Sequence, residues 1–246
     1  MPMLANWLVL NKNDHENKGD VVLQKHFLGT KERAIEDITE MLNKYSGTKR
    51  GYLLSSWLSE YSRFIKQEET FKPQFLKRYK RGEIVKVNLG YKIGCEEGGP
   101  HYAIVLDKQN SIYSDNLLIL PLSSKKETTK FNRYTLDLGN EIYEKLQEKY
   151  LQKFNECIKD VSAEFSEDQK TIKLSVKVDS SEADKVQEEI DSMKAGSIAL
   201  ISQITTISKI RIIKPKRTTE ALSDICVCSE TLDKIDKQIK ELYIGK

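Results

Sequence analysis

The sequence has few of the residues that build metal centres and disulfide frameworks. It contains three histidines and four cysteines in 246 residues. No pair of cysteines has the C-x-x-C spacing, and Cys226 and Cys228 are too close together to indicate a zinc pair. We therefore expect no metal site, no cofactor and no disulfide, with the thiols reduced as in a cytoplasm. The histidines are His15, His26 and His101, and the other two cysteines are Cys95 and Cys157.

Long hydrophobic runs are absent as well. No apolar stretch approaches the roughly 20 residues that a membrane-spanning helix needs. The first residues lack the basic, apolar and small-residue order of a secretory signal. Apolar residues make up 39% and charged residues 31% of the chain, which is typical of a folded, water-soluble protein of one or two domains. We expect a cytoplasmic protein with no membrane partner.

The net charge of +3 hides an uneven distribution. Residues 71–92 hold seven bases and one acid (+6), and residues 205–219 hold five bases and no acid (+5). Residues 139–192 hold fourteen acids and eight lysines (−6). Basic segments that converge in space attract polyanions with a steep dependence on salt. Ordinary solvated surface lysines explain the same charges equally well.

The first third of the chain predicts two helices. Apolar residues recur at helical spacing over residues 31–45, with Thr30 suited to the N-cap and Gly47 to the C-terminal stop. A second helix is predicted over residues 52–67, whose aromatic side chains favour a core or a helix–helix contact.

After Arg81 the pattern changes to the alternation of β-strands. Alternation predicts a strand near residues 85–89, and compact apolar runs predict buried strands at residues 103–106 and 117–122. Residues 133–138 are another candidate strand, and a glycine-rich turn lies between the first two. Short strands separated by glycine turns favour a small barrel or sandwich over a parallel α/β sheet.

The second half of the chain mixes both periods. An amphipathic helix is predicted from Ile142 to Val161, and residues 171–178 alternate as a strand. A helix is predicted from Ser181 to Met193, where a serine and an acid three residues on resemble a capping box. Residues 197–201 and 209–213 return to strand, and a closing helix begins at Ser229.

Three segments resemble the MazF/PemK (Kid) toxins, in the order that this family shows. Residues 80–106 begin with Arg-Gly-Glu-Ile and continue into Gly-Cys-Glu-Glu-Gly-Gly-Pro-His-Tyr at residues 94–102. Residues 117–124 resemble the strand that ends in a catalytic Thr or Ser, with Ser123 at that position. Residues 197–209 are similar to the family's late strand and its Gln-containing segment.

The resemblance implies an α+β fold, a small SH3-like β-barrel of the MazF/PemK/CcdB type that is usually a homodimer. The barrel domain would span residues 79–246 after a mainly helical extension at 1–78, with an α/β insertion at 140–194. The resemblance also implies a metal-independent endoribonuclease that cleaves single-stranded RNA, such as mRNA, with the RNA's own 2′-hydroxyl as nucleophile. Its implied partners are RNA and a cognate antitoxin protein in a toxin–antitoxin system.

The resemblance assigns the chemistry to two residues, His101 and Ser123. His101 stands where the family has a loop arginine, and a histidine can act as an acid or a base near neutral pH. Ser123 would contact the scissile phosphate or orient the 2′-hydroxyl. The predicted substrate-binding residues are Glu96, Gly98, Gly99, Tyr102, Ser124, Lys125, Lys126 and Gln203.

Two alternatives stay open from the sequence. The loss of the loop arginine is also consistent with a catalytically degenerate RNA-binding module on the same fold. The CcdB toxins use this barrel to poison DNA gyrase, so a protein target is the other alternative. We further expect the acidic insertion to pack beside the basic barrel and narrow its RNA groove.

Overall fold

The computed structural model describes residues 16–165, 172–178 and 180–245. It divides into two compact units, residues 1–59 and 60–246. The first unit contains α1 (Glu16–Lys44) and the start of α2 (Lys49–Glu68). Its chain reverses at Gly47, whose φ of 71° lies in the left-handed region that favours glycine. The predicted stop of the first helix is thus confirmed.

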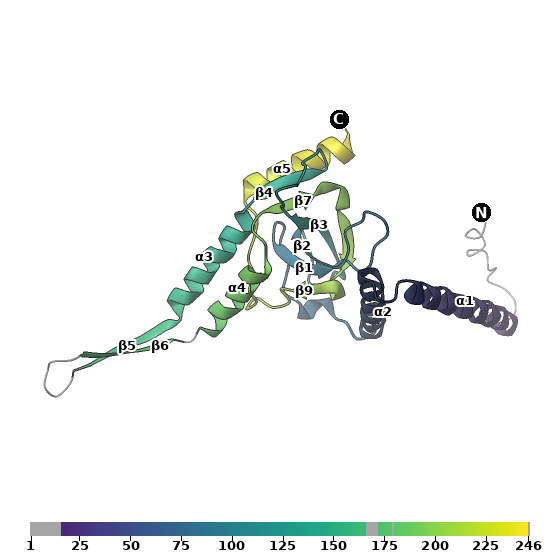
Figure 1. The fold of residues 1–246 in the computed structure, drawn as a ribbon, viewed down its shortest axis with the longest axis horizontal. Coiled ribbons are helices and arrows are strands. Elements are labelled where there is room, and N and C mark those ends of the chain that lie inside the picture. The colour runs from purple at the N-terminus through teal and green to yellow at the C-terminus, as the bar shows by residue number, and fades with distance from the viewer. Residues whose placement is uncertain (1–15, 166–171, 179, 246) are drawn as a thin grey trace. The chain divides into compact units, whose positions relative to one another are not determined.

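The second unit is built around one antiparallel sheet (Figure 1). Hydrogen bonds connect its strands in the order β4-β7-β3-β2-β1-β9, and β8 pairs with β3. The strands are β1 (Ile84–Asn88), β2 (Pro100–Val105), β3 (Asn116–Ser124), β4 (Thr135–Gly139), β7 (Ser197–Leu200), β8 (Thr205–Ser208) and β9 (Ile212–Lys214). No hydrogen bonds between the end strands β4 and β9 appear in the described chain, so the sheet is not closed. The predicted α+β class is confirmed.

The two faces of the sheet bury different hydrophobic clusters, because successive side chains of a strand point to opposite sides. Val85, Ala103 and Ile119 belong to one cluster. Ile84, Ile104 and Leu120 belong to the other. The second cluster also contains residues of α3 (Glu141–Glu156), α4 (Ser181–Ser192) and α5 (Ser229–Ile239). The helices therefore cover one face of the sheet.

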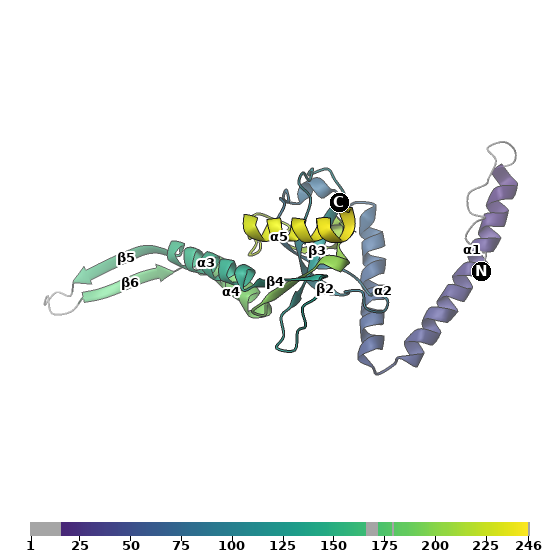
Figure 2. The ribbon, with the colours of Figure 1, turned by 90° about the horizontal axis from the view of Figure 1, so that it is seen from above.

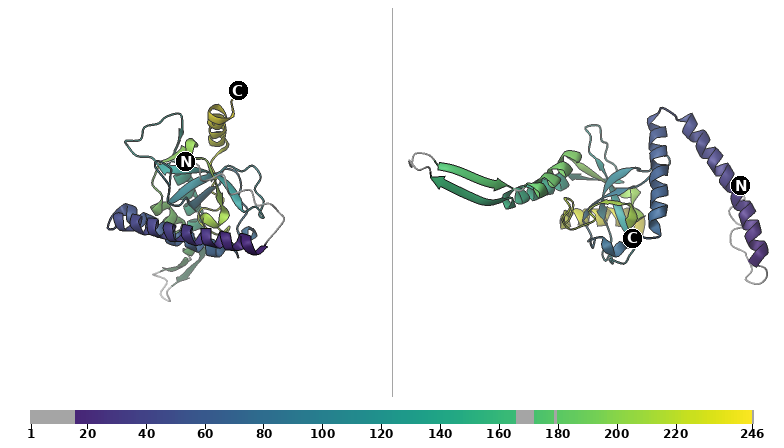
Figure 3. Two further views of the ribbon diagram at one scale, coloured as in Figure 1. Left: turned by 90° about the vertical axis from the view of Figure 1, so that its right-hand side faces the viewer. Right: turned by 90° about the horizontal axis from the view of Figure 1, so that it is seen from below.

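The predicted insertion is part of this core. Ile142 and Leu146 of α3, and Val186 and Ile190 of α4, are buried in the cluster that the sheet contributes to. Figures 2 and 3 show α3 and α4 side by side; α3 leads into β5 (Ile158–Phe165) and β6 (Ile172–Val178) leads into α4, and the two strands form a separate sheet. The acidic segment thus packs on the sheet, while the narrowing of an RNA groove stays a prediction.

Three predicted elements are corrected by the structure. The first helix begins at Glu16, so Thr30 lies inside it and is not its N-cap. The helix from Ile142 ends at Glu156, because residues 158–165 pair with β6 instead of continuing the helix. Residues 209–211 form a 3₁₀ turn, and the strands there are β8, which the sequence analysis missed, and β9.

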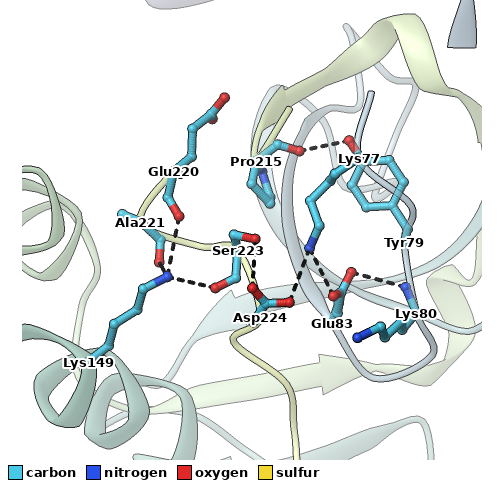
Figure 4. A network of polar contacts seen from close by, with 10 residues as sticks. All are labelled: Lys77, Tyr79, Lys80, Glu83, Lys149, Pro215, Glu220, Ala221, Ser223 and Asp224. Carbon is cyan, nitrogen blue, oxygen red and sulfur yellow. Dashed lines mark hydrogen bonds and ion pairs between the residues drawn. The ribbon is translucent and has the colours of Figure 1, made fainter. Parts of the chain in front are cut away.

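A buried ion pair fixes the chain where it enters the sheet (Figure 4). The Lys77 ammonium lies 2.9 Å from the Glu83 carboxylate, and both side chains are almost fully buried. The second oxygen of Glu83 accepts the backbone N–H of Lys80. Tyr79 donates its hydroxyl to the Pro215 carbonyl, and burial raises the pKa of this phenol. These bonds hold the segment before β1 against the loop after β9.

On the opposite side of this loop, Lys149 of α3 acts as a structural cation (Figure 4). Its ammonium donates to the carbonyls of Ala221 and Ser223 at 2.9 and 2.7 Å, and burial lowers its pKa. Carbonyl oxygens in a loop have no ladder partner, and the ammonium satisfies them.

A second buried carboxylate, Glu189, attaches α4 to the sheet. Its side chain is fully buried and accepts the Tyr102 hydroxyl at 2.6 Å and the Lys214 ammonium at 2.5 Å. Lys86 lies 4.0 Å from the same carboxylate. The contact joins α4 to neighbouring positions on β1, β2 and β9.

We predict that Glu189→Ala lowers the free energy of unfolding by about 3 kcal/mol, because it removes the buried acceptor that Tyr102 and Lys214 share. Urea denaturation of the full chain measures this. Glu188→Ala, at an exposed neighbouring position of the same helix, should change stability by less than about 0.5 kcal/mol. Equal unfolding midpoints for the two variants would contradict the structural role of Glu189.

Glu141 connects the start of α3 to the start of α5. Its carboxylate accepts the backbone N–H of Cys228, the N-cap residue of α5, and the Thr231 hydroxyl at 2.7 Å. Burial raises the pKa of Glu141, but the hydrogen bonds from Thr231 and Cys228 outweigh it, so the net pKa lies below its ordinary value. The ionised form is therefore favoured in the folded state.

This lowered pKa makes the stability contribution of Glu141 dependent on pH. A carboxyl whose pKa is lower in the folded state stabilises fully above its unfolded value, about 4.3, and loses this contribution as the pH falls through the folded value. We expect Glu141→Gln to cost about 1 kcal/mol at pH 7, as the loss of a helix cap does, and progressively less below about pH 4. Denaturation curves from pH 3 to 7 test this; a constant difference would contradict it.

Candidate active site

The candidate site lies where the loop of residues 89–99 meets the ends of β2 and β3. Two backbone hydrogen bonds close this loop, from Gly99 N to the Gly90 carbonyl and from Leu89 N to the Gly99 carbonyl, each 2.8 Å long. Gly99 has a φ of 80°. At Gly98 a Cβ atom would lie 2.7 Å from the Gly90 oxygen, so the close approach of the two loop arms requires glycine there.

His101, the second residue of β2, is held at this loop by two contacts. Its Nδ1 atom lies 3.0 Å from the Leu122 carbonyl, and its Nε2 atom lies 3.4 Å from a carboxylate oxygen of Glu97. Because the carbonyl only accepts, Nδ1 carries a proton. The side chain is 22% exposed, so Nε2 is the nitrogen available for chemistry.

Ser123 lies on the neighbouring strand, directly after the residue that His101 contacts. The β2–β3 ladder pairs Ala103 with Pro121, and residues 122–124 of β3 pair with β7. His101 Nδ1 lies 3.0 Å from the Leu122 carbonyl, and Ser123 is the next residue of β3. The two residues assigned to catalysis are 22 residues apart in the sequence and belong to the ends of adjacent strands.

A pocket of about 330 Å³ adjoins this pair. Glu97, Pro121 and Gln203 are among its lining residues. The Gln203 side chain lies 3.5 Å from both the Glu97 backbone nitrogen and the Cys95 carbonyl, across the base of the loop. The remaining lining residues are Leu89, Lys92, Glu96, Ser202, Ile204 and Thr205. The predicted binding residues Glu96 and Gln203 are thus part of one pocket.

Four predicted binding residues lie elsewhere or are already engaged. Tyr102 points to the opposite face of β2 from His101 and is bound to Glu189; burial and this hydrogen bond raise the pKa of its phenol. Lys125 forms a 2.6 Å ion pair with Asp137, which lowers the pKa of that carboxyl. Ser124 pairs with Ser197 of β7, and Lys126 is exposed.

The predicted binding glycines form the turn of this loop. The Gly99 N–H donates to the Gly90 carbonyl and so is engaged within the loop, while Gly98 gives the loop room to close. Glu97 was not among the predicted site residues; its neighbour Glu96 is exposed and faces Lys92 at 4.0 Å. In the sequence, only the i to i+4 separation connected Glu97 with His101. This spacing indicates neighbouring side chains in a helix, and it carries no such information in a glycine-rich loop.

Several basic residues of the two basic segments form contacts within the protein. Arg81 bonds to Asp236 and to the Leu106 carbonyl, and Arg211 donates to the Asn88 carbonyl at 2.8 Å. Lys209 is buried, donates to the Ser111 carbonyl, and has its pKa lowered by that burial. Lys77, Lys86 and Lys214 are paired with acidic side chains as well. The net charge of a segment is therefore larger than the unpaired charge on its surface.

The described residues contain no cluster of three or more metal-ligating side chains of the His, Cys, Asp and Glu types. All four cysteines are free thiols. No described helix is long and apolar enough to span a membrane.

An antiparallel sheet with helices on one face, and with a histidine and a carboxylate in contact beside a pocket, defines a small α+β protein with a polar candidate active site. Residues 80–159 match the family described as PemK-like, MazF-like toxins of type II toxin–antitoxin systems. This match confirms the resemblance to the MazF/PemK toxins seen in the sequence. It covers about a third of the chain and includes α3. No curated protein matches the chain significantly.

We predict that Gly98→Ala opens the loop, because the added methyl group and the Gly90 carbonyl cannot both keep their positions. Overpacking of this kind costs about 1–3 kcal/mol, and amide resonances of residues 89–101 should shift. Thermal unfolding and ¹H–¹⁵N spectra measure both effects. Gly29→Ala in α1, where a Cβ meets nothing within 4 Å, is the control and should not destabilise. An unchanged loop spectrum for Gly98→Ala would contradict the prediction.

Proposed function

We propose that the protein is the toxin of a toxin–antitoxin pair and acts as a metal-independent endoribonuclease on single-stranded RNA. The observation that carries this proposal is the position of His101, which contacts the Leu122 carbonyl next to Ser123 and the carboxylate of Glu97 at a polar pocket. The family match supplies the class of substrate. An antitoxin protein and a homodimeric state belong to the same proposal.

The reaction joins the 2′-oxygen of one nucleotide to its own 3′-phosphate and releases the 5′-oxygen of the next. It needs a base for the 2′-hydroxyl, an acid for the leaving oxygen, and donors for the charged phosphorane. His101 offers Nε2 for proton transfer, and the Ser123 hydroxyl is a donor on the neighbouring strand. The Gln203 amide and Lys92 at the pocket add polar groups for the rest of the strand.

The histidine replaces the family's loop arginine, and it changes what the position can do. An arginine stays charged and stabilises an anion, whereas an imidazole also moves protons. We propose that the position keeps its place at the phosphate and takes over proton transfer. Under the alternative, a catalytically degenerate RNA-binding module, the same exchange removes catalytic activity.

A long single-stranded RNA incubated with the full chain in EDTA separates these alternatives. We expect discrete fragments with 2′,3′-cyclic phosphate and 5′-hydroxyl ends. His101→Ala should lower the rate by at least about 100-fold, the usual contribution of a proton-transfer group. His26→Ala is the matched control, a histidine in α1 outside the candidate site, and should cleave at the wild-type rate.

Other outcomes would overturn the proposal. Salt-sensitive RNA binding without cleavage would identify the binding module. Intact RNA together with inhibition of gyrase would identify a protein-targeting toxin.

A further inference from the structure

The contact between Glu97 and His101 was selected neither by the sequence motifs nor by the family resemblance, which pointed to Glu96. A Glu97 carboxylate oxygen lies 3.4 Å from His101 Nε2, and the two side chains are 33% and 22% exposed. Glu97 also lines the pocket beside them. A carboxylate facing an imidazole at the edge of a pocket is an arrangement with acid–base potential.

We propose that Glu97 and His101 are the base and the acid of RNA cleavage, with Glu97 accepting the 2′-hydroxyl proton and His101 Nε2 donating to the leaving 5′-oxygen. This inference rests on the proposed function. It names a catalytic carboxylate and divides the two proton transfers between two side chains.

The Leu122 carbonyl fixes the role of each imidazole nitrogen. Nδ1 is committed to this backbone acceptor, so Nε2 is the only nitrogen that exchanges a proton with substrate. A protonated Nε2 can donate a hydrogen bond to an ionised Glu97 carboxylate. The proposed reaction starts from these two states, and the 3.4 Å contact places the two groups together for it.

The step balances with these two groups. The 2′-hydroxyl proton passes to Glu97 while the 2′-oxygen bonds to phosphorus. The bond from phosphorus to the 5′-oxygen breaks, and this oxygen takes the proton from Nε2. The products are a 2′,3′-cyclic phosphate and a 5′-hydroxyl, with a protonated Glu97 and a neutral His101.

The direct contact between Glu97 and His101 also restores their starting protonation states. After the products leave, Glu97 returns its proton to Nε2 across the 3.4 Å contact of the free protein. During the reaction the phosphate lies between the two side chains, so they must separate. Glu97 stands in a loop between Gly94 and Gly98, and its third-exposed side chain has the open pocket beside it.

A substrate with sulfur in place of the leaving 5′-oxygen tests the division of labour, because a thiolate leaves without protonation. On ordinary RNA, Glu97→Gln and His101→Ala should each cleave at least about 100-fold more slowly than the wild-type chain. On the 5′-thio substrate, His101→Ala should recover to within about tenfold of the wild-type rate, while Glu97→Gln stays slow. Glu188→Gln, exposed on α4, should match the wild-type protein on both substrates.

The outcomes separate this inference from the proposed function. Rescue of Glu97→Gln instead of His101→Ala, rescue of neither, or full activity of Glu97→Gln on ordinary RNA would overturn the pair and leave the nuclease intact. A wild-type chain that cleaves neither substrate would overturn both.

The ¹⁵N resonances of the imidazole provide a readout without RNA. The full chain has three histidines, so the His101→Ala spectrum identifies the ring of His101. The neutral ring should be in the Nδ1–H form, and an Nε2–H form would overturn the assignment. The thermal unfolding curve of Glu97→Gln should match that of the wild-type chain, which shows that lost cleavage is not lost folding.

Discussion

The fully buried carboxylate of Glu189 is the contact on which the arrangement of the second unit depends. Burying a charge is costly unless its partners surround it, and here a tyrosine hydroxyl and a lysine ammonium do so at 2.6 and 2.5 Å. Those partners come from β2 and β9, so one side chain of α4 joins two strands that are not neighbours in the sheet. The bonds also have strict geometry, which apolar packing alone lacks, and they fix where the acidic helix lies on the sheet.

The attachment of α4 through Glu189 also affects the candidate site, because strand β2 carries both Tyr102 and His101. Tyr102 points toward α4 and His101 toward the opposite face, since side chains alternate along a strand. A strand held by Tyr102 on one side presents His101 on the other with little freedom. The Leu122 carbonyl and the closed loop of residues 89–99 complete this positioning. The structural contact of Tyr102 and the proposed chemical role of His101 thus belong to adjacent residues on opposite faces of the sheet.

Much of this fold was readable from local pattern. Alternating apolar residues located β1 and β6, compact apolar runs located β2 and β3, and a glycine stop located the end of α1. The motif around residues 80–106 gave the resemblance to the toxin family, and the place of its arginine gave His101. The start of α1 was wrong because Thr30 lies inside the helix. Two other errors share a cause: the end of α3 and the presence of β8 depend on strand pairing, and helical spacing at Ile158 carries no information about such partners.

The sequence by itself determined the strand alternation, the glycine loop and the identity of the histidine at its end, because each depends on neighbours in the chain. The tertiary structure decided which charges remain available and which carboxylate meets the histidine. Glu96 and Glu97 are equivalent in the sequence, and only the path of the closed loop turns Glu97 toward Nε2. Tyr102 and Glu189 are 87 residues apart, and hydrogen bonding between them exists only once α4 packs on the sheet.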